Sequence, residues 1–137
     1  MLKWKKKYEV GIPIIDEQHK QLFKIIDRAY KLLRRHSTDK YDETLEILDE
    51  LVAYSKMHFE TEERIMKENN YPNFKEHKAS HDKFLMEVEE IITKAIHDVD
   101  DNMLRKILNI LVEWLIGHIY GNDKDMGITI RNMNKNL

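Results

Sequence analysis

Five of the seven histidines lie where a helix would otherwise bury leucine or isoleucine. They are His19, His58, His77, His81 and His118. Glu62 follows His58 by four residues, so both side chains leave one helix face one turn apart. His81 has the same relation to His77, and Asp123 follows His118 by five residues. Imidazole and carboxylate groups bind metal ions, so these seven residues are candidate ligands.

The donor set is large enough for two metal ions. Five imidazoles offer five nitrogens, and two carboxylates that each bridge both ions offer four oxygens. A bridging oxo or hydroxo group adds two contacts, which makes eleven of the roughly twelve that two octahedral ions need. One position therefore stays open for a small ligand. Imidazole and carboxylate donors without thiolates favour iron or manganese, whereas a structural zinc site needs only four ligands. Iron also supplies the redox chemistry that an open position invites.

The spacing between His118 and Asp123 does not fit a regular helix. Five residues of α-helix turn by about 500°, which leaves the two side chains roughly 140° apart. If both are ligands, a wide turn or a helix end must lie between them. Gly121 supplies backbone freedom there and is expected to end the last helix.

The helices that position these residues follow from apolar spacings of three and four. We predict one domain over 1–137, all-α, folded as an antiparallel up-down-up-down four-helix bundle over 16–123. An irregular N-terminal arm (1–15) precedes the bundle, and a weakly patterned C-terminal tail (124–137) follows it. The expected helices span 16–36, 41–69, 73–97 and 102–121. Short connections make neighbouring helices antiparallel, so all candidate ligands should meet at one end of the bundle.

Composition excludes several classes of protein. A net charge of −2 offers no field for nucleic acid, and the cluster of Lys3, Lys5, Lys6 and Lys7 reads as a solvated arm. The chain has no cysteine, which excludes disulfides and thiolate ligands and fits a reducing cytoplasm. No apolar run of about 18 residues and no signal peptide is found, so we expect a cytoplasmic protein that does not enter a membrane.

Each motif has a plainer interpretation when taken alone. A single His-x-x-x-His pair is more often surface or core histidine than ligand, and His-x-x-x-Glu is an ordinary helix pair. Four such elements at one bundle end favour metal. His36 and His97 fall near the far helix ends and are not ligand candidates. Glu60 and Glu63 are assigned to a solvated face. Gln18 or Glu17 either orients a ligand imidazole or merely serves the first helical turn.

The ordered set of motifs resembles the hemerythrin family, in particular its single-domain bacterial members, the bacteriohemerythrins. The resemblance covers nearly the whole chain. It rests on the ligand pairs and on Trp4, Tyr8, Gly11, Asp16-Glu17-Gln18-His19-Lys20, His58-Phe59, Glu62-Glu63, Met66, Tyr71-Pro72, Trp114-Leu115 and His118-Ile119. Members of that family include up-down helical bundles.

The resemblance implies reversible dioxygen binding at a non-haem di-iron centre with a bridging oxo or hydroxo group. His77, His81 and His118 would hold one iron, and His19 and His58 the other, which keeps the open position. Glu62 and Asp123 would bridge the two. An apolar pocket would cover the open position and exclude water; its residues would be Phe59, Trp114, Leu115 and Ile119.

Three other functions compete with oxygen storage, delivery or buffering, for which no enzyme activity is expected. A di-iron oxidase, peroxidase or nitric oxide reductase could use the same bundle, although the usual Glu-x-x-His motif of oxygen-activating bundles is missing. A sensor would need a partner, which stays unknown, and we expect a monomer or weak homo-oligomer. Iron storage fits least, because five imidazoles saturate a fixed pair of ions.

Overall fold

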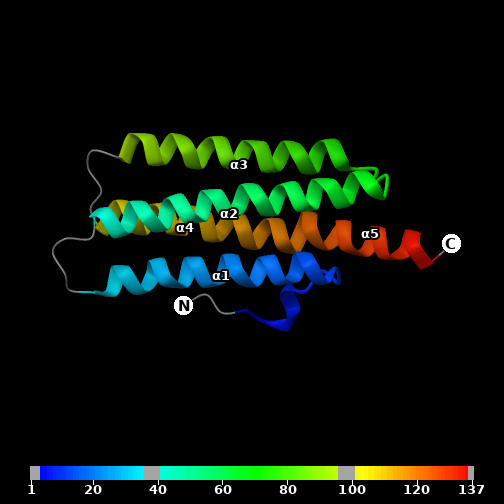
Figure 1. Ribbon diagram of the computed structural model, residues 1–137, viewed down its shortest axis with the longest axis horizontal. Coiled ribbons are helices and arrows are strands. Elements are labelled where there is room, and N and C mark those ends of the chain that lie inside the picture. The colour runs from blue at the N-terminus through cyan, green and yellow to red at the C-terminus, as the bar shows by residue number, and fades with distance from the viewer. Residues whose placement is uncertain (1–3, 36–40, 96–100, 136–137) are drawn as a thin grey trace.

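The chain folds into four long antiparallel helices, described by a computed structural model over residues 4–35, 41–95 and 101–135. The helices are α1 (Pro13–Arg34), α2 (Tyr41–Glu68), α3 (Phe74–Ala95) and α4 (Asp101–His118). Each runs opposite to the one before it, and α4 closes the bundle between α1 and α3 (Figure 1). The predicted all-α, up-down-up-down four-helix bundle is confirmed.

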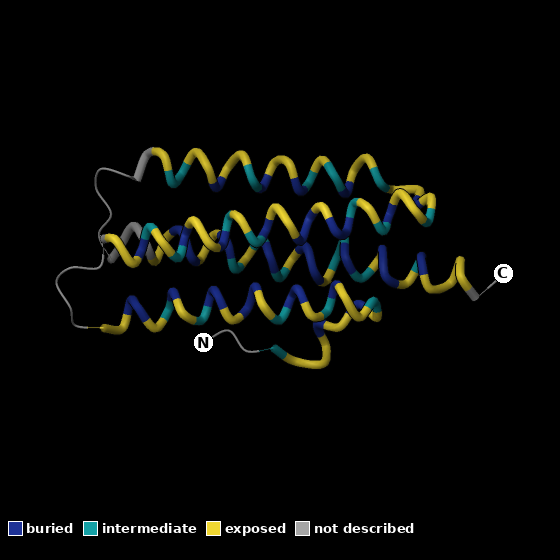
Figure 2. The backbone as a smooth tube through the Cα atoms, viewed as in Figure 1, coloured by how far each residue is buried: buried dark blue, intermediate teal, exposed yellow. Residues whose placement is uncertain are grey.

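Buried residues form one stripe along each helix, and exposed residues lie on the opposite face (Figure 2). In α1 the stripe contains Leu22, Ile26 and Ala29, all at most 1% exposed. In α4 it contains Leu108 and Leu111, also almost fully buried. Burying one such aliphatic side chain stabilises the fold by roughly 1.5–3 kcal/mol, so the apolar stripes hold the helices at fixed positions.

The first helix begins earlier than predicted. It starts at Pro13 rather than Asp16, because proline at the first helical position already has the required φ. Asp16 instead binds the arm, accepting hydrogen bonds from the backbone N–H groups of Val10 (2.8 Å) and Gly11 (3.3 Å). Gly11 has φ of 86°, a conformation that favours glycine, and it turns the arm into α1. The arm also contains a short 3₁₀ helix, Lys6–Tyr8.

The fourth helix does not end at Gly121, and the weakly patterned tail forms a further helix. A π-helical turn, η2 (Ile119–Asp123), follows α4 directly, and α5 (Lys124–Lys135) continues the same rod (Figure 1). The Lys124 N–H donates to the Ile119 carbonyl, five residues back. The predicted wide turn is therefore present, whereas the expected helix end at Gly121 is wrong.

The tail helix α5 packs against the arm. Met126 and Ile130 are buried in the same cluster as Tyr8 and Val10. Gly127 lies so close to the Val10 carbonyl that a side chain there would collide with it. The arm and α5 thus cover the end of the bundle where the candidate ligands lie.

The remaining helix ends agree with the predicted ones to within two residues. His36 and His97, which are not ligand candidates, lie outside the described residues. None of the helices in the described ranges is both long and apolar enough to cross a bilayer.

Candidate metal centre

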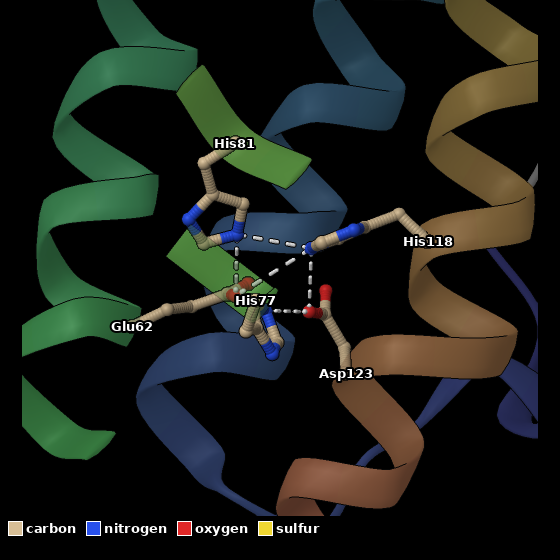
Figure 3. A group of neighbouring side chains, drawn as sticks. All are labelled: Glu62, His77, His81, His118 and Asp123. Atoms are coloured by element: carbon tan, nitrogen blue, oxygen red, sulfur yellow. Dashed lines mark hydrogen bonds and ion pairs between the residues drawn. The ribbon is translucent and has the colours of Figure 1, made fainter. Parts of the chain in front are cut away.

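All seven candidate ligands meet inside one end of the bundle, and none is more than 5% exposed. α1 supplies His19, α2 supplies His58 and Glu62, and α3 supplies His77 and His81. His118 is the last residue of α4, and Asp123 is the last of η2. Figure 3 shows five of the seven, from α2, α3, α4 and η2, pointing toward one another.

Glu62 faces two groups of imidazoles, one with each oxygen. Its Oε1 lies 2.6 Å from Nε2 of His58 and 3.5 Å from Nε2 of His19. Its Oε2 lies 3.0 Å from Nε2 of His77 and 3.2 Å from that of His81. We call His19 and His58 the histidine pair, and His77, His81 and His118 the histidine trio.

Asp123 divides its oxygens in the same way. Oδ2 lies 2.9 Å from Nε2 of His19, in the pair. Oδ1 lies 3.0 Å from Nε2 of His77 and 2.9 Å from that of His118, in the trio. The π turn permits this, because about five residues complete one turn there and bring His118 and Asp123 to the same face.

The carboxylates therefore belong to two donor sets. The trio with Glu62 and Asp123 offers five donor atoms, and the pair with the same carboxylates offers four, each set within 4.8 Å. A carboxylate with one oxygen toward each set has the arrangement of a bridging ligand. Two cations side by side match this division.

The hydrogen bonding of these groups fits cations better than it fits the protein alone. Five buried ligand atoms have no hydrogen-bond partner of good geometry among the described residues: Nε2 of His19, Nε2 of His58, Oε1 of Glu62 and both Asp123 oxygens. In addition, Nε2 of His81 lies 3.0 Å from Nε2 of His118. Buried polar atoms are normally satisfied, and inward-facing lone pairs at such distances repel unless a proton or metal ion lies between them. The donor set thus suits a pair of metal cations.

Protons can replace cations in this cluster. Burial opposes the charging of His19, but Asp123 and Glu62 outweigh it and raise its pKa to about 9. The pKa of His118 rises to about 9 for the same reasons, with Asp123 as the main partner. Burial opposes ionisation of Glu62 and Asp123, yet the imidazoles lower both pKa values well below the ordinary range. Cation binding must therefore displace protons.

Three residues behind the imidazoles were missed or left open by the sequence. Gln18 is placed with Oε1 2.7 Å from Nδ1 of His58, whereas Glu17 is exposed and pairs with Lys20. The assignment of Glu63 to a solvated face is wrong, because its Oε2 lies 2.9 Å from Nδ1 of His81. Asn122 lies 3.2 Å from Nδ1 of His118.

Two of the four predicted pocket residues, Phe59 and Trp114, lie against ligand rings. Phe59 stacks on His81 with ring centroids 4.0 Å apart, and Trp114 stacks on His118 at 4.4 Å. Leu115 and Ile119 are buried in the main core cluster. The two rings thus lie against the trio, although Phe59 also approaches His58, with centroids 5.8 Å apart. Their contact with a bound ligand stays a prediction.

Comparisons with known proteins agree with this geometry. Residues 10–127 match the family model described as the hemerythrin HHE cation binding domain. The chain is 35% identical to a bacteriohemerythrin of Clostridium acetobutylicum, over 91% of this chain and 98% of that protein. It is 32% identical to a bacteriohemerythrin of Stenotrophomonas maltophilia, over 90% of this chain and 78% of that protein. A crystal structure of wild-type hemerythrin superposes with a TM-score of 0.80 at 27% identity, covering 95% of this chain and 98% of that one.

Proposed function

The chain belongs to the hemerythrin family, and from that premise we propose that it binds dioxygen reversibly at a di-iron centre. The observation that carries the proposal is the division of the Glu62 and Asp123 oxygens between the histidine pair and the histidine trio. Five imidazoles and two bridging carboxylates would then hold two irons.

The unequal donor sets support an open coordination position at the histidine pair. If an oxo or hydroxo group added one donor to each set, the trio set would offer six donors and the pair set would offer five. The open position would therefore belong to the iron held by His19 and His58. Two ferrous ions, when bound, would supply this open position and two electrons that dioxygen can take up and later return.

The role of the chain is to orient the ligands and to keep water away. Gln18 and Glu63 accept hydrogen bonds from Nδ1 of His58 and His81, which leaves both Nε2 atoms facing Glu62, where they would hold the irons. Phe59, Trp114, Leu115 and Ile119 would keep water and protons from the open position, and this protects the ferrous state.

The first test is reversibility. The protein is reconstituted with ferrous iron under argon, iron is counted per chain, and air and argon are alternated while the visible spectrum is recorded. We expect two irons per chain and full recovery over several cycles. A single irreversible oxidation, or turnover of peroxide or nitric oxide faster than free iron achieves, would instead support an enzyme.

The second test addresses the ligands. His77 faces both carboxylates, so His77→Ala should lower the iron content below two per chain. The matched control is Lys75→Ala, at an exposed position of the same helix, which should keep two irons. Equal loss of iron in both variants would contradict the assignment.

The third test addresses the apolar cover. Ile119→Thr places a hydroxyl at a fully buried position and should accelerate irreversible oxidation in air. Ile110→Thr makes the same chemical change at a residue that is 38% exposed, and it should oxidise at the wild-type rate. Equal rates in the two variants would remove Ile119 from the proposed pocket.

A further inference from the structure

One imidazole in each group, His81 in the trio and His58 in the pair, has a glutamate or glutamine side chain behind it, and these two partners differ in charge. In the trio, Nδ1 of His81 lies 2.9 Å from Oε2 of Glu63, a side chain that is 17% exposed. The other Glu63 oxygen lies 3.5 Å from Nζ of Lys78. A carboxylate only accepts hydrogen bonds, so Nδ1 of His81 carries the proton and Nε2 presents its lone pair to the centre. The partner behind His81 is therefore a charged one.

The corresponding partner in the pair is neutral. The Thr61 hydroxyl donates to the Met57 carbonyl (3.0 Å), so its oxygen accepts from Nε2 of Gln18 (3.2 Å). This fixes the orientation of the Gln18 amide and turns Oε1 toward Nδ1 of His58, 2.7 Å away. His58 thus has the same tautomer as His81, but no charge stands behind it.

Charge behind an imidazole changes how well the ring binds a cation. An ionised carboxylate on the Nδ1 proton draws that proton toward itself and leaves more electron density at Nε2 than an amide does. A ring backed by Glu63 is therefore a stronger donor than one backed by Gln18. The trio set has more donor atoms and also the charged partner, so both features favour cation binding at the trio.

We propose that Glu63 and Gln18 are positioning residues that make the two cation positions unequal. Glu63 makes the trio position bind the first divalent cation, and bind it more tightly. Gln18 keeps the pair position weaker, as suits the metal that must leave one coordination position open. This inference rests on the proposed function, because it assumes that both sets bind a cation.

The test is an anaerobic titration of the metal-free protein with Co²⁺, in which calorimetry measures each binding step. The wild type should bind two ions in two separate steps. Glu63→Gln keeps a hydrogen-bond acceptor and removes the charge; it should weaken the first step by about tenfold and leave the second unchanged. Gln18→Glu adds the charge to the pair and should tighten the second step by about tenfold. Glu60→Gln removes a charge from an exposed position of the same helix and should change neither step.

A spectroscopic readout identifies the position that fills first. With one equivalent of Co²⁺, proton NMR should show three strongly shifted, exchangeable imidazole N–H signals, those of the trio. Two such signals would overturn the proposed order. Equal weakening of both steps by Glu63→Gln, or no tightening by Gln18→Glu, would overturn the roles of these residues. Failure of the wild type to bind two Co²⁺ ions would instead count against the proposed function.

Discussion

The two halves of the bundle use the same helix stripes for different purposes. Beyond the ligand level, the stripe positions hold apolar side chains such as Ile26 in α1, Leu48 in α2 and Leu108 in α4. About two to four turns nearer the other end of the bundle, the same stripes hold imidazoles and carboxylates that are equally buried. The apolar half is held by packing, which needs no partner. The ligand half places charges in the interior and depends on protons or cations to balance them.

The strongest test of this difference is metal loading. Cations bind the folded ligand half and not the unfolded chain, so a free concentration 100 times the dissociation constant at both positions should raise the unfolding free energy by about 5 kcal/mol. Anaerobic urea denaturation with and without Co²⁺ measures the gain. An unchanged unfolding midpoint would show that the stability of the ligand half, like that of the apolar half, does not depend on bound cations.

A cavity in the apolar half should act independently of metal. Leu108 is fully buried, so Leu108→Ala should lower the unfolding free energy by about 4 kcal/mol in the metal-free and loaded proteins alike. The iron content should stay at two per chain. Ile110→Ala, at a residue of the same helix that is 38% exposed, should cost less than about 1 kcal/mol. A loss of iron in Leu108→Ala would show that the halves are coupled.

The pH dependence of stability should differ between the metal-free and the loaded protein. A histidine whose pKa rises from 6.5 to about 9 on folding stabilises the metal-free protein fully below pH 6.5, and this contribution disappears as pH rises through 9. The lowered pKa values of Glu62 and Asp123 stabilise it above about pH 4.5, and this contribution is lost toward acid.

The metal-free protein should therefore be most stable between about pH 5 and 6.5, and it should lose on the order of 3 kcal/mol by pH 9. Urea unfolding across this pH range provides the measurement. With both cations bound the alkaline loss should vanish, because metal ions replace the protons. A metal-free protein that is equally stable at pH 6 and pH 9 would contradict the proton-balanced cluster.

The smallest expected effect separates backbone geometry from ligand chemistry. Asn70 follows α2 at the ligand end with φ of 52°, a left-handed conformation that asparagine and glycine tolerate best. Asn70→Ala should lower the unfolding free energy by about 1 kcal/mol in both metal states, whereas Asn70→Gly should not. Thermal unfolding with and without metal tests this. A loss confined to the loaded protein would tie this turn to the ligands instead.

The sequence alone predicts what depends on periodicity within one helix. The bundle and the common level of the seven residues follow from apolar stripes and from connections that make neighbouring helices antiparallel. The need for a wide turn between His118 and Asp123 follows from their spacing alone. Such a pattern cannot predict a contact that depends on how one helix is rotated about its axis relative to the next. Glu63 reaches His81 across the α2–α3 interface, and no spacing along the chain indicates that approach.

The tail was missed for a related reason. In α5 only about one residue per turn, Met126 and then Ile130, enters the core cluster, and that stripe is too narrow to stand out from the sequence. Its angular position is also displaced from that of α4 by the π turn. The early start of α1 was missed because Asp16 resembles an N-terminal helix residue, whereas in the structure it binds the arm.

The π turn η2 interrupts the α-helical geometry of the continuous rod that α4 and α5 form. This turn sets the angular position, relative to α4, of Asp123 and of the face of α5 that packs against the arm. Deleting a single residue from 119–122 would rotate that whole segment by about 100° against α4, moving a ligand and the arm's packing surface in one step. The length of this stretch is therefore tightly constrained, whereas the side chain of Tyr120, which is 40% exposed, is freer to vary.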